Sequence, residues 1–166
     1  MARSIVGHIS GMVIRELDSR DGPSLQGLCE ACADFYELAY QRPPGAAEAQ
    51  GIYTGLPRGA SYRDKLLLGV FDRTGLVAVV DVIKASRTGR SWQIGLVLLK
   101  PECRNHGLGT KLYRKVRNIA RADGATIIEL AVAPANISAI RFWLRQGFVQ
   151  LDSAGDMVRM QAKITQ

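Results

Sequence analysis

The sequence is poor in the residues that mark several classes of protein. It has three cysteines, two histidines and 7% aromatic residues among its 166 positions. An odd, small number of cysteines argues against a disulfide framework, and no cysteine–histidine cluster has the spacing of a zinc site. No apolar run approaches the roughly 20 residues of a membrane span, and the N-terminal apolar stretch is too broken for a signal peptide. We therefore expect a cytoplasmic protein with no metal and no membrane span.

The length and the hydrophobic content are typical of one folded domain. A chain of 166 residues, 47% of them hydrophobic, buries enough surface to fold without a disulfide or metal staple. We expect a single domain over residues 1–166. Lysine and arginine exceed acidic residues by 22 to 15, a net charge of +7. This excess suggests an anionic partner, which is a nucleic acid, a membrane surface or a phosphorylated small molecule.

Two of the cysteines form a single C-x-x-C pair, Cys29 and Cys32. A redox site usually places this motif at the start of a helix after a strand, whereas here it lies within an apparent helix. We expect these two residues, and Cys103 further on, to be packing thiols.

The first half of the chain predicts a strand, two helices and an antiparallel meander. The strand covers Met12–Leu17, one helix runs from about Asp21 to Tyr40, and a shorter helix covers Ala46–Tyr53. Three strands joined by short turns follow, at Lys65–Phe71, Leu76–Ala85 and Ser91–Leu99. The last of these is nearly continuous apolar sequence, as in a central strand that is covered on both faces.

The second half alternates helices and strands. Apolar residues at steps of four, four and three mark a helix that begins after Gly107 and ends at Asp123-Gly124. A strand over Thr126–Val132, a helix capped by Asn136, and closing strands at Phe148–Leu151 and Asp156–Ala162 around a Ser153–Gly155 turn complete the chain. We predict an α+β fold, with one mixed central sheet of about six to seven strands and helices on both faces.

The segment between the last meander strand and the basic helix has the chemistry of an anion site. Two glycines, Gly107 and Gly109, allow a tight turn and a close backbone approach to a ligand. The first amides of a helix have no intrahelical acceptor, and with the helix dipole they suit a pyrophosphate. A tight strand-to-helix turn alone also explains both glycines. The spacing fits neither a P-loop nor a dinucleotide-binding fingerprint.

Two motifs in this half resemble the GNAT superfamily of N-acetyltransferases. The stretch LLKPECRNHGLGTKLY is similar to its R/Q-x-x-G-x-G/A signature, at Arg104, Gly107 and Gly109. About 30 residues later, APANISAIRFWLRQGF is similar to its second block. The matching residues there are Asn136, Ala139, Phe142, Trp143, Gly147 and Phe148.

The resemblance implies an acetyl-CoA-binding site and a GNAT-like fold. The backbone of Val97, Leu98 and Leu99 is then expected to pair with the pantetheine arm, in a gap where this strand splays from its neighbour. Asn136 and Trp143 are expected beside the cofactor, although Asn136 is equally explained as a plain helix cap. The pyrophosphate is expected at the amides of Arg104, Asn105, His106, Gly107, Leu108, Gly109 and Thr110.

The resemblance also implies direct transfer of acetyl from the thioester to a primary amine of a small molecule or a protein. A neutral amine needs a general base. The candidates are Asp81, a carboxylate on a strand face shared with Val77, Val79 and Ile83, and Glu129, beside the splay. By position, the amide of Leu99 is the expected oxyanion donor.

One residue departs from the family pattern. Trp143 stands where the family often has a tyrosine that protonates the leaving thiolate, and an indole N–H does not titrate usefully. We therefore expect no dedicated general acid, and a non-catalytic acyl-CoA-binding or sensing module is the alternative. Nucleic-acid binding is not expected, because the basic helix carries only one aromatic residue, Tyr113. A homodimer is compatible with the family, and the sequence leaves the acceptor amine open.

Overall fold

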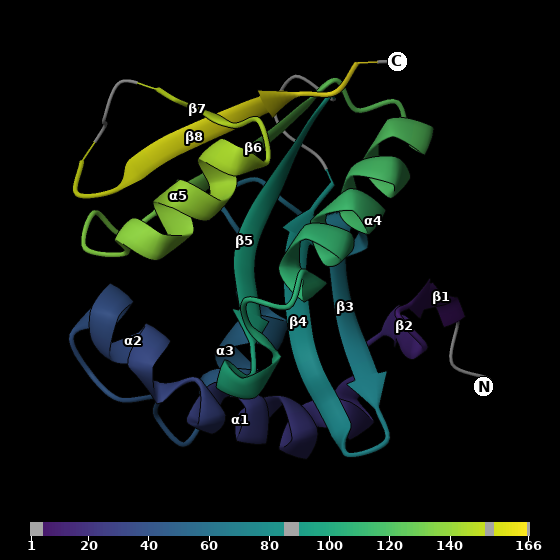
Figure 1. The fold of residues 1–166 in the computed structure, drawn as a ribbon, viewed down its shortest axis with the longest axis vertical. Helices are drawn as coiled ribbons and strands as arrows, with labels where there is room; N and C mark the ends of the chain where they lie inside the picture. Colours follow the sequence, from purple (N-terminus) through teal and green to yellow (C-terminus); the bar gives the residue numbers. More distant parts are fainter. Residues whose placement is uncertain (1–4, 85–89, 152–154, 166) are drawn as a thin grey trace.

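A computed structural model describes residues 5–84, 90–151 and 155–165. These residues form one eight-stranded sheet in the order β1-β2-β3-β4-β5-β6-β8-β7, together with five α-helices (Figure 1). The strands are β1 (Ile5–Ile9), β2 (Met12–Glu16), β3 (Lys65–Asp72), β4 (Gly75–Ile83), β5 (Ser91–Leu99), β6 (Ile127–Val132), β7 (Val149–Gln150) and β8 (Val158–Lys163). The helices are α1 (Gly22–Ala31), α2 (Ala33–Tyr40), α3 (Glu48–Thr54), α4 (Leu108–Ala122) and α5 (Ile137–Arg145).

The predicted fold class is confirmed, but the sheet has more strands than the six to seven expected. The additional strand is β1, which pairs with β2 through a two-residue turn. Both turn residues have positive φ, 51° at Ser10 and 79° at Gly11, as a type I′ hairpin requires. Serine is not a strong signal for that turn, so the sequence did not predict this hairpin.

The central strands separate along their length. β5 pairs in parallel with β6 only through Ser91–Ile94 and Ile127–Leu130, and then continues to Leu99 beside β4 alone (Figure 1). A β-bulge lies where the separation begins, since Asp81 pairs with Leu96 but Val82 pairs with Ile94, which leaves Gly95 as the extra residue. The sheet is therefore open between β5 and β6, and backbone groups of β5 face that opening.

Helices cover both faces of the sheet. The apolar side of α4 and the buried Trp143 of α5 pack on one face, in a core with Val80, Val82 and Ile94. The three helices α1, α2 and α3 pack on the other face, in a second core with Val79 and Leu98. The arrangement explains the steps of four, four and three in α4, because that stripe is the face that lies on the sheet.

One predicted strand face is partly wrong. A register shift between Val70 and Phe71 makes Val77 an extra residue in β4, and its side chain packs in the α4 core rather than with Val79. Asp81 follows Val79 by two residues and so lies on the α1–α3 face. The predicted strand end at Ala85 and most of the turn after it lie outside the described residues, as does most of the Ser153–Gly155 turn.

The long first helix is two helices. The backbone at Cys32, with φ −99° and ψ 32°, separates α1 from α2 while its N–H still bonds to Leu28 and Cys29. Cys29 and Cys32 are buried free thiols. Within residues 5–84, 90–151 and 155–165 no group of side chains could hold a metal ion, and no helix is long and apolar enough to cross a bilayer.

Candidate active site

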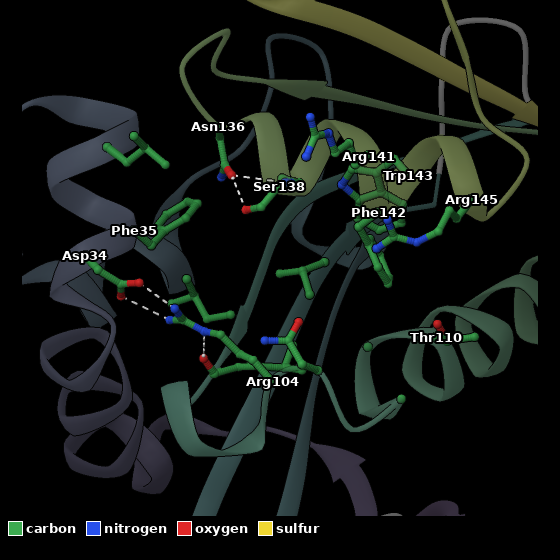
Figure 2. Close-up of a pocket in the computed structure, with 18 residues that line it drawn as sticks. Asp34, Phe35, Arg104, Thr110, Asn136, Ser138, Arg141, Phe142, Trp143 and Arg145 are labelled. Atoms are coloured by element: carbon green, nitrogen blue, oxygen red, sulfur yellow. Dashed lines mark hydrogen bonds and ion pairs between the residues drawn. The ribbon is translucent and has the colours of Figure 1, made fainter.

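A cleft of about 670 Å³ lies between the end of β5, the loop that leads into α4, and the helices α2 and α5 (Figure 2). All but two of the residues predicted to bind the cofactor line it. The exceptions are His106, which is exposed, and Leu108, which is buried in the core under α4. The lining residues predicted from sequence are Val97, Leu98, Leu99, Arg104, Asn105, Gly107, Gly109, Thr110, Asn136 and Trp143.

The backbone of β5 is open to the cleft at every second residue. The N–H of Lys100 bonds to the carbonyl of Val77 at 2.9 Å, so the alternation of an antiparallel pair turns the N–H of Leu99 away from β4. The same alternation turns Val97 outward and directs the backbone of Leu98 towards β4. Free backbone groups in an extended strand are what a pantetheine arm needs to pair as an additional strand.

The loop before α4 presents unpaired amides. Gly107 is the N-cap of α4 with φ +80°, and no side chain caps the helix there. The first amides of α4 therefore have no intrahelical partner and carry the positive end of the helix dipole. Gly109 has a packing reason to be glycine, since a Cβ there would lie 3.3 Å from Cζ of Phe142. The loop has the geometry of an anion site, as the glycine pattern predicted.

Arg104 faces α2 rather than the amides of the loop. Its guanidinium forms an ion pair with both carboxylate oxygens of Asp34, with an Nη2–Oδ1 distance of 3.1 Å (Figure 2). Its Nε donates to the carbonyl of Leu99 at 3.0 Å, and Sγ of Cys32 donates to the same carbonyl at 3.2 Å. The hydrogen bond from Arg104 lowers the pKa of Asp34. Arg104 thus holds the end of β5 and ties it to α2.

The start of α5 places polar groups at the cleft. Oδ1 of Asn136 accepts the N–H of Ala139 and the hydroxyl of Ser138, both at 3.1 Å, so Asn136 caps the helix. Its Nδ2 has no partner within the described part of the chain and is available to a carbonyl oxygen of a ligand. The cap and the expected contact with a cofactor are therefore compatible in one side chain.

Trp143 lies in an aromatic cluster at the edge of the cleft. Its ring centroid is 5.6 Å from that of Tyr113, 5.0 Å from Phe148 and 4.8 Å from Phe142. Tyr113 is buried, which raises the pKa of its hydroxyl, and it does not line the cleft. Neither residue is placed to supply a proton readily to a thiolate.

The two carboxylates predicted as bases do not line this cleft; both lie on the α1–α3 face of the sheet, on β4 and β6, with β5 between them. Asp81 is nearly buried and pairs with Lys65 at 2.7 Å through Oδ2, while its Oδ1 has no hydrogen-bond partner. Burial raises the pKa of Asp81, and Lys65 opposes that shift. Glu129 is half-buried between Gln93 and Gln161 in the register. Both acids thus flank the start of the splay.

Several cleft residues escaped the sequence reasoning. Asp34 and Phe35 come from α2, and no local pattern links that helix to a loop 70 residues later. Ser138, Arg141 and Arg145 come from α5. Their spacing of three and four residues is one helix face, a signal that could have found them.

Comparison with known proteins agrees with this architecture. The model of the acetyltransferase (GNAT) family matches residues 26–148. An uncharacterized N-acetyltransferase of Methanocaldococcus jannaschii is 33% identical over 72 residues, which are 43% of this chain and only 32% of that relative. The match therefore spans about a third of the relative's length.

Solved structures share the fold at low sequence identity. An acetyltransferase of Thermus thermophilus superposes with a TM-score of 0.78 at 17% identity, over 95% of this chain and 99% of that one. The PaiA N-acetyltransferase of Thermoplasma acidophilum, solved in complex with coenzyme A, gives 0.73 at 20% identity, over 92% and 98%. The family model covers most of the sequence and the whole sheet has the architecture of these acetyltransferases, so this chain belongs to the GNAT family.

Proposed function

We propose that this protein is an N-acetyltransferase that moves acetyl from acetyl-CoA to a primary amine of a small molecule or a protein. The observation that carries the proposal is the separation of β5 from β6, which leaves the backbone of Val97 and the N–H of Leu99 open beside the unpaired amides of α4. An extended polar arm that ends in a pyrophosphate fits this combination of strand edge and helix N-terminus.

Each part of acetyl-CoA then has a partner in the chain. The pantetheine arm pairs with Val97 and Leu99, and Nδ2 of Asn136 donates to one of its amide carbonyls. The pyrophosphate accepts from the amides between Gly107 and Thr110. The thioester comes to the start of the splay, which is next to the bulge at Gly95.

The transfer is a direct attack. The nitrogen of the neutral amine bonds to the thioester carbonyl carbon, the outward N–H of Val97 stabilises the oxyanion, and the C–S bond breaks to release the thiolate. The N–H of Leu99, the donor expected from the sequence, is four residues beyond Gly95, about 13 Å along an extended strand, so in this proposal it pairs with the arm instead. Asp81 is the base that takes the proton lost by the attacking nitrogen in this proposal, because Asp81 pairs with Leu96 at the bulge and its Oδ1 has no hydrogen-bond partner. Burial raises the pKa of this carboxyl above its ordinary value. Glu129 is the alternative base on the same face.

The released thiolate takes its proton from solvent in this proposal. Trp143 offers only an indole N–H, and buried Tyr113 lies outside the cleft. The tryptophan at position 143, where the family often has a tyrosine, favours a second candidate function, a module that binds acyl-CoA without turning it over.

A screen of amines with acetyl-CoA distinguishes the two functions. Thiol release and acetylated product are measured together for amino acids, polyamines, aminoglycosides and peptides with free N-termini. Release that requires an amine supports the enzyme. Binding of CoA with no release on any amine class supports the sensor, and no binding at all contradicts both.

A further inference from the structure

The cations nearest to the phosphate loop in sequence are not the ones that face it in space. Arg104 is held by Asp34 and by the carbonyl of Leu99. Lys111 donates from Nζ to the hydroxyl of Ser10 at 2.6 Å, so it points to the β1–β2 hairpin. Neither Arg114 nor Lys115 lines the cleft. The basic stretch that follows the loop therefore supplies the cleft with little direct charge.

The helix on the opposite wall supplies that charge. Arg145 lines the cleft from the last turn of α5, and Figure 2 shows its guanidinium beside Phe142, in the space across from the loop and Thr110. Nε2 of Gln146 donates to the hydroxyl of Thr110 at 3.1 Å, which fixes this end of α5 against the first turn of α4. No carboxylate pairs with Arg145 within the described ranges, so its charge is available to a ligand.

Arg141 also lines the cleft, but it is one helical turn earlier. Figure 2 shows its guanidinium pointing away from the phosphate loop. The two arginines thus do not converge, and only Arg145 stands opposite the amides of α4.

We propose that Arg145 binds the pyrophosphate of the acyl-CoA from the side opposite to those amides, and so makes the protein select nucleotide thioesters over pantetheine thioesters. This inference rests on the proposed function. The loop amides are uncharged donors, whereas a pyrophosphate diester is fully ionised at neutral pH. A guanidinium adds charge-assisted, bidentate hydrogen bonds to phosphate oxygens, which neutral amides do not provide.

Calorimetric titration with CoA, 3′-dephospho-CoA and pantetheine tests the proposal. For Arg145→Ala we expect about 10-fold weaker binding of CoA and of 3′-dephospho-CoA, and unchanged binding of pantetheine. Arg145→Lys keeps the charge without the planar fork and should lose less. The control is Arg121→Ala, which removes an exposed arginine at the far end of α4 and should bind all three ligands like the wild type.

Each other outcome overturns the assignment. A loss for CoA alone places Arg145 on the 3′-phosphate, and an equal loss for all three ligands, or none, removes it from phosphate binding. Thermal unfolding of each variant confirms that it is folded, as expected for an exposed side chain. A wild type that does not bind CoA contradicts the proposed function itself, which separates that failure from failure of the role of Arg145.

Discussion

The left-handed backbone at Gly107 gives the sharpest prediction about the phosphate loop. Its φ is +80°, and a Cβ built there meets nothing within 4 Å, so Gly107→Ala changes only the backbone preference and creates no clash. Holding an L-residue in the left-handed region costs roughly 1–2 kcal/mol. The preceding residues Asn105 and His106 are exposed, so their side chains do little to hold this part of the loop in the native conformation.

In the free variant we therefore expect the loop to relax away from the left-handed conformation, and ligand binding must restore that conformation. If most of the conformational free energy opposes binding in this way, the affinity for CoA falls about 5- to 30-fold. The part that remains in the free protein lowers its stability. If all of it remained there, the melting temperature would fall by roughly 2–8 °C for a domain of this size. Calorimetric titration with CoA and thermal unfolding measure the two parts separately.

Two companion variants isolate the cause. Gly107→Asn should recover most of the affinity, because asparagine tolerates the left-handed region. Gly124→Ala makes the same backbone change at the other end of α4, where φ is +85° and the Cβ space is equally empty. It should lose stability without losing affinity. The reasoning is refuted if Gly107→Ala binds CoA no more weakly than Gly124→Ala does.

Further variants test the chemistry and the packing around the cleft. Trp143→Phe should change the acetylation rate only a few-fold, and a loss of orders of magnitude at unchanged CoA affinity would show that the indole takes part in the chemistry. Asp81→Asn should lower the rate at pH 7 by about 100-fold or more while CoA binding is kept. A matched loss in Glu129→Gln instead would move the base to Glu129. Burial raises the pKa of Asp81 above its usual value of 3.8. In the wild type, kcat/KM should therefore fall as the pH drops through this raised pKa, because the carboxylate becomes protonated. Arg104 lowers the pKa of Asp34, so in urea titrations the wild type should be slightly more stable than Asp34→Asn above pH 3.8, and this difference should vanish at lower pH. A difference that persists in acid would contradict the ion pair.

The elements that the sequence predicted well are those whose signals are local. β5 was predicted with the bounds that it has, Ser91–Leu99, because a continuous apolar run between turns marks a buried strand. α4 followed from its apolar stripe and the glycines at its two ends. The loop and Asn136 were found through two motifs, each of which is one short continuous stretch of the chain.

What the sequence missed depends on tertiary contacts. The ion pair of Asp34 with Arg104 joins residues 70 apart, and no periodicity reports such a pairing. The register shift at Val77 comes from the pairing of β3 with β4 and moves one side chain to the other core. The sequence also could not predict where the basic side chains point. Lys111 and Arg104 are next to the loop in sequence, but their charged groups bind Ser10 and Asp34 on other elements.

The most direct test of the central claim follows the acetyl group itself. The purified protein is incubated with acetyl-CoA labelled in the acetyl carbon and with the best amine from the screen, and free thiol and labelled amide are quantified over time. The account predicts that thiol and labelled amide appear in equal amounts and only when the amine is present. Thiol release without labelled amide, or CoA binding with no release on any amine, would contradict it.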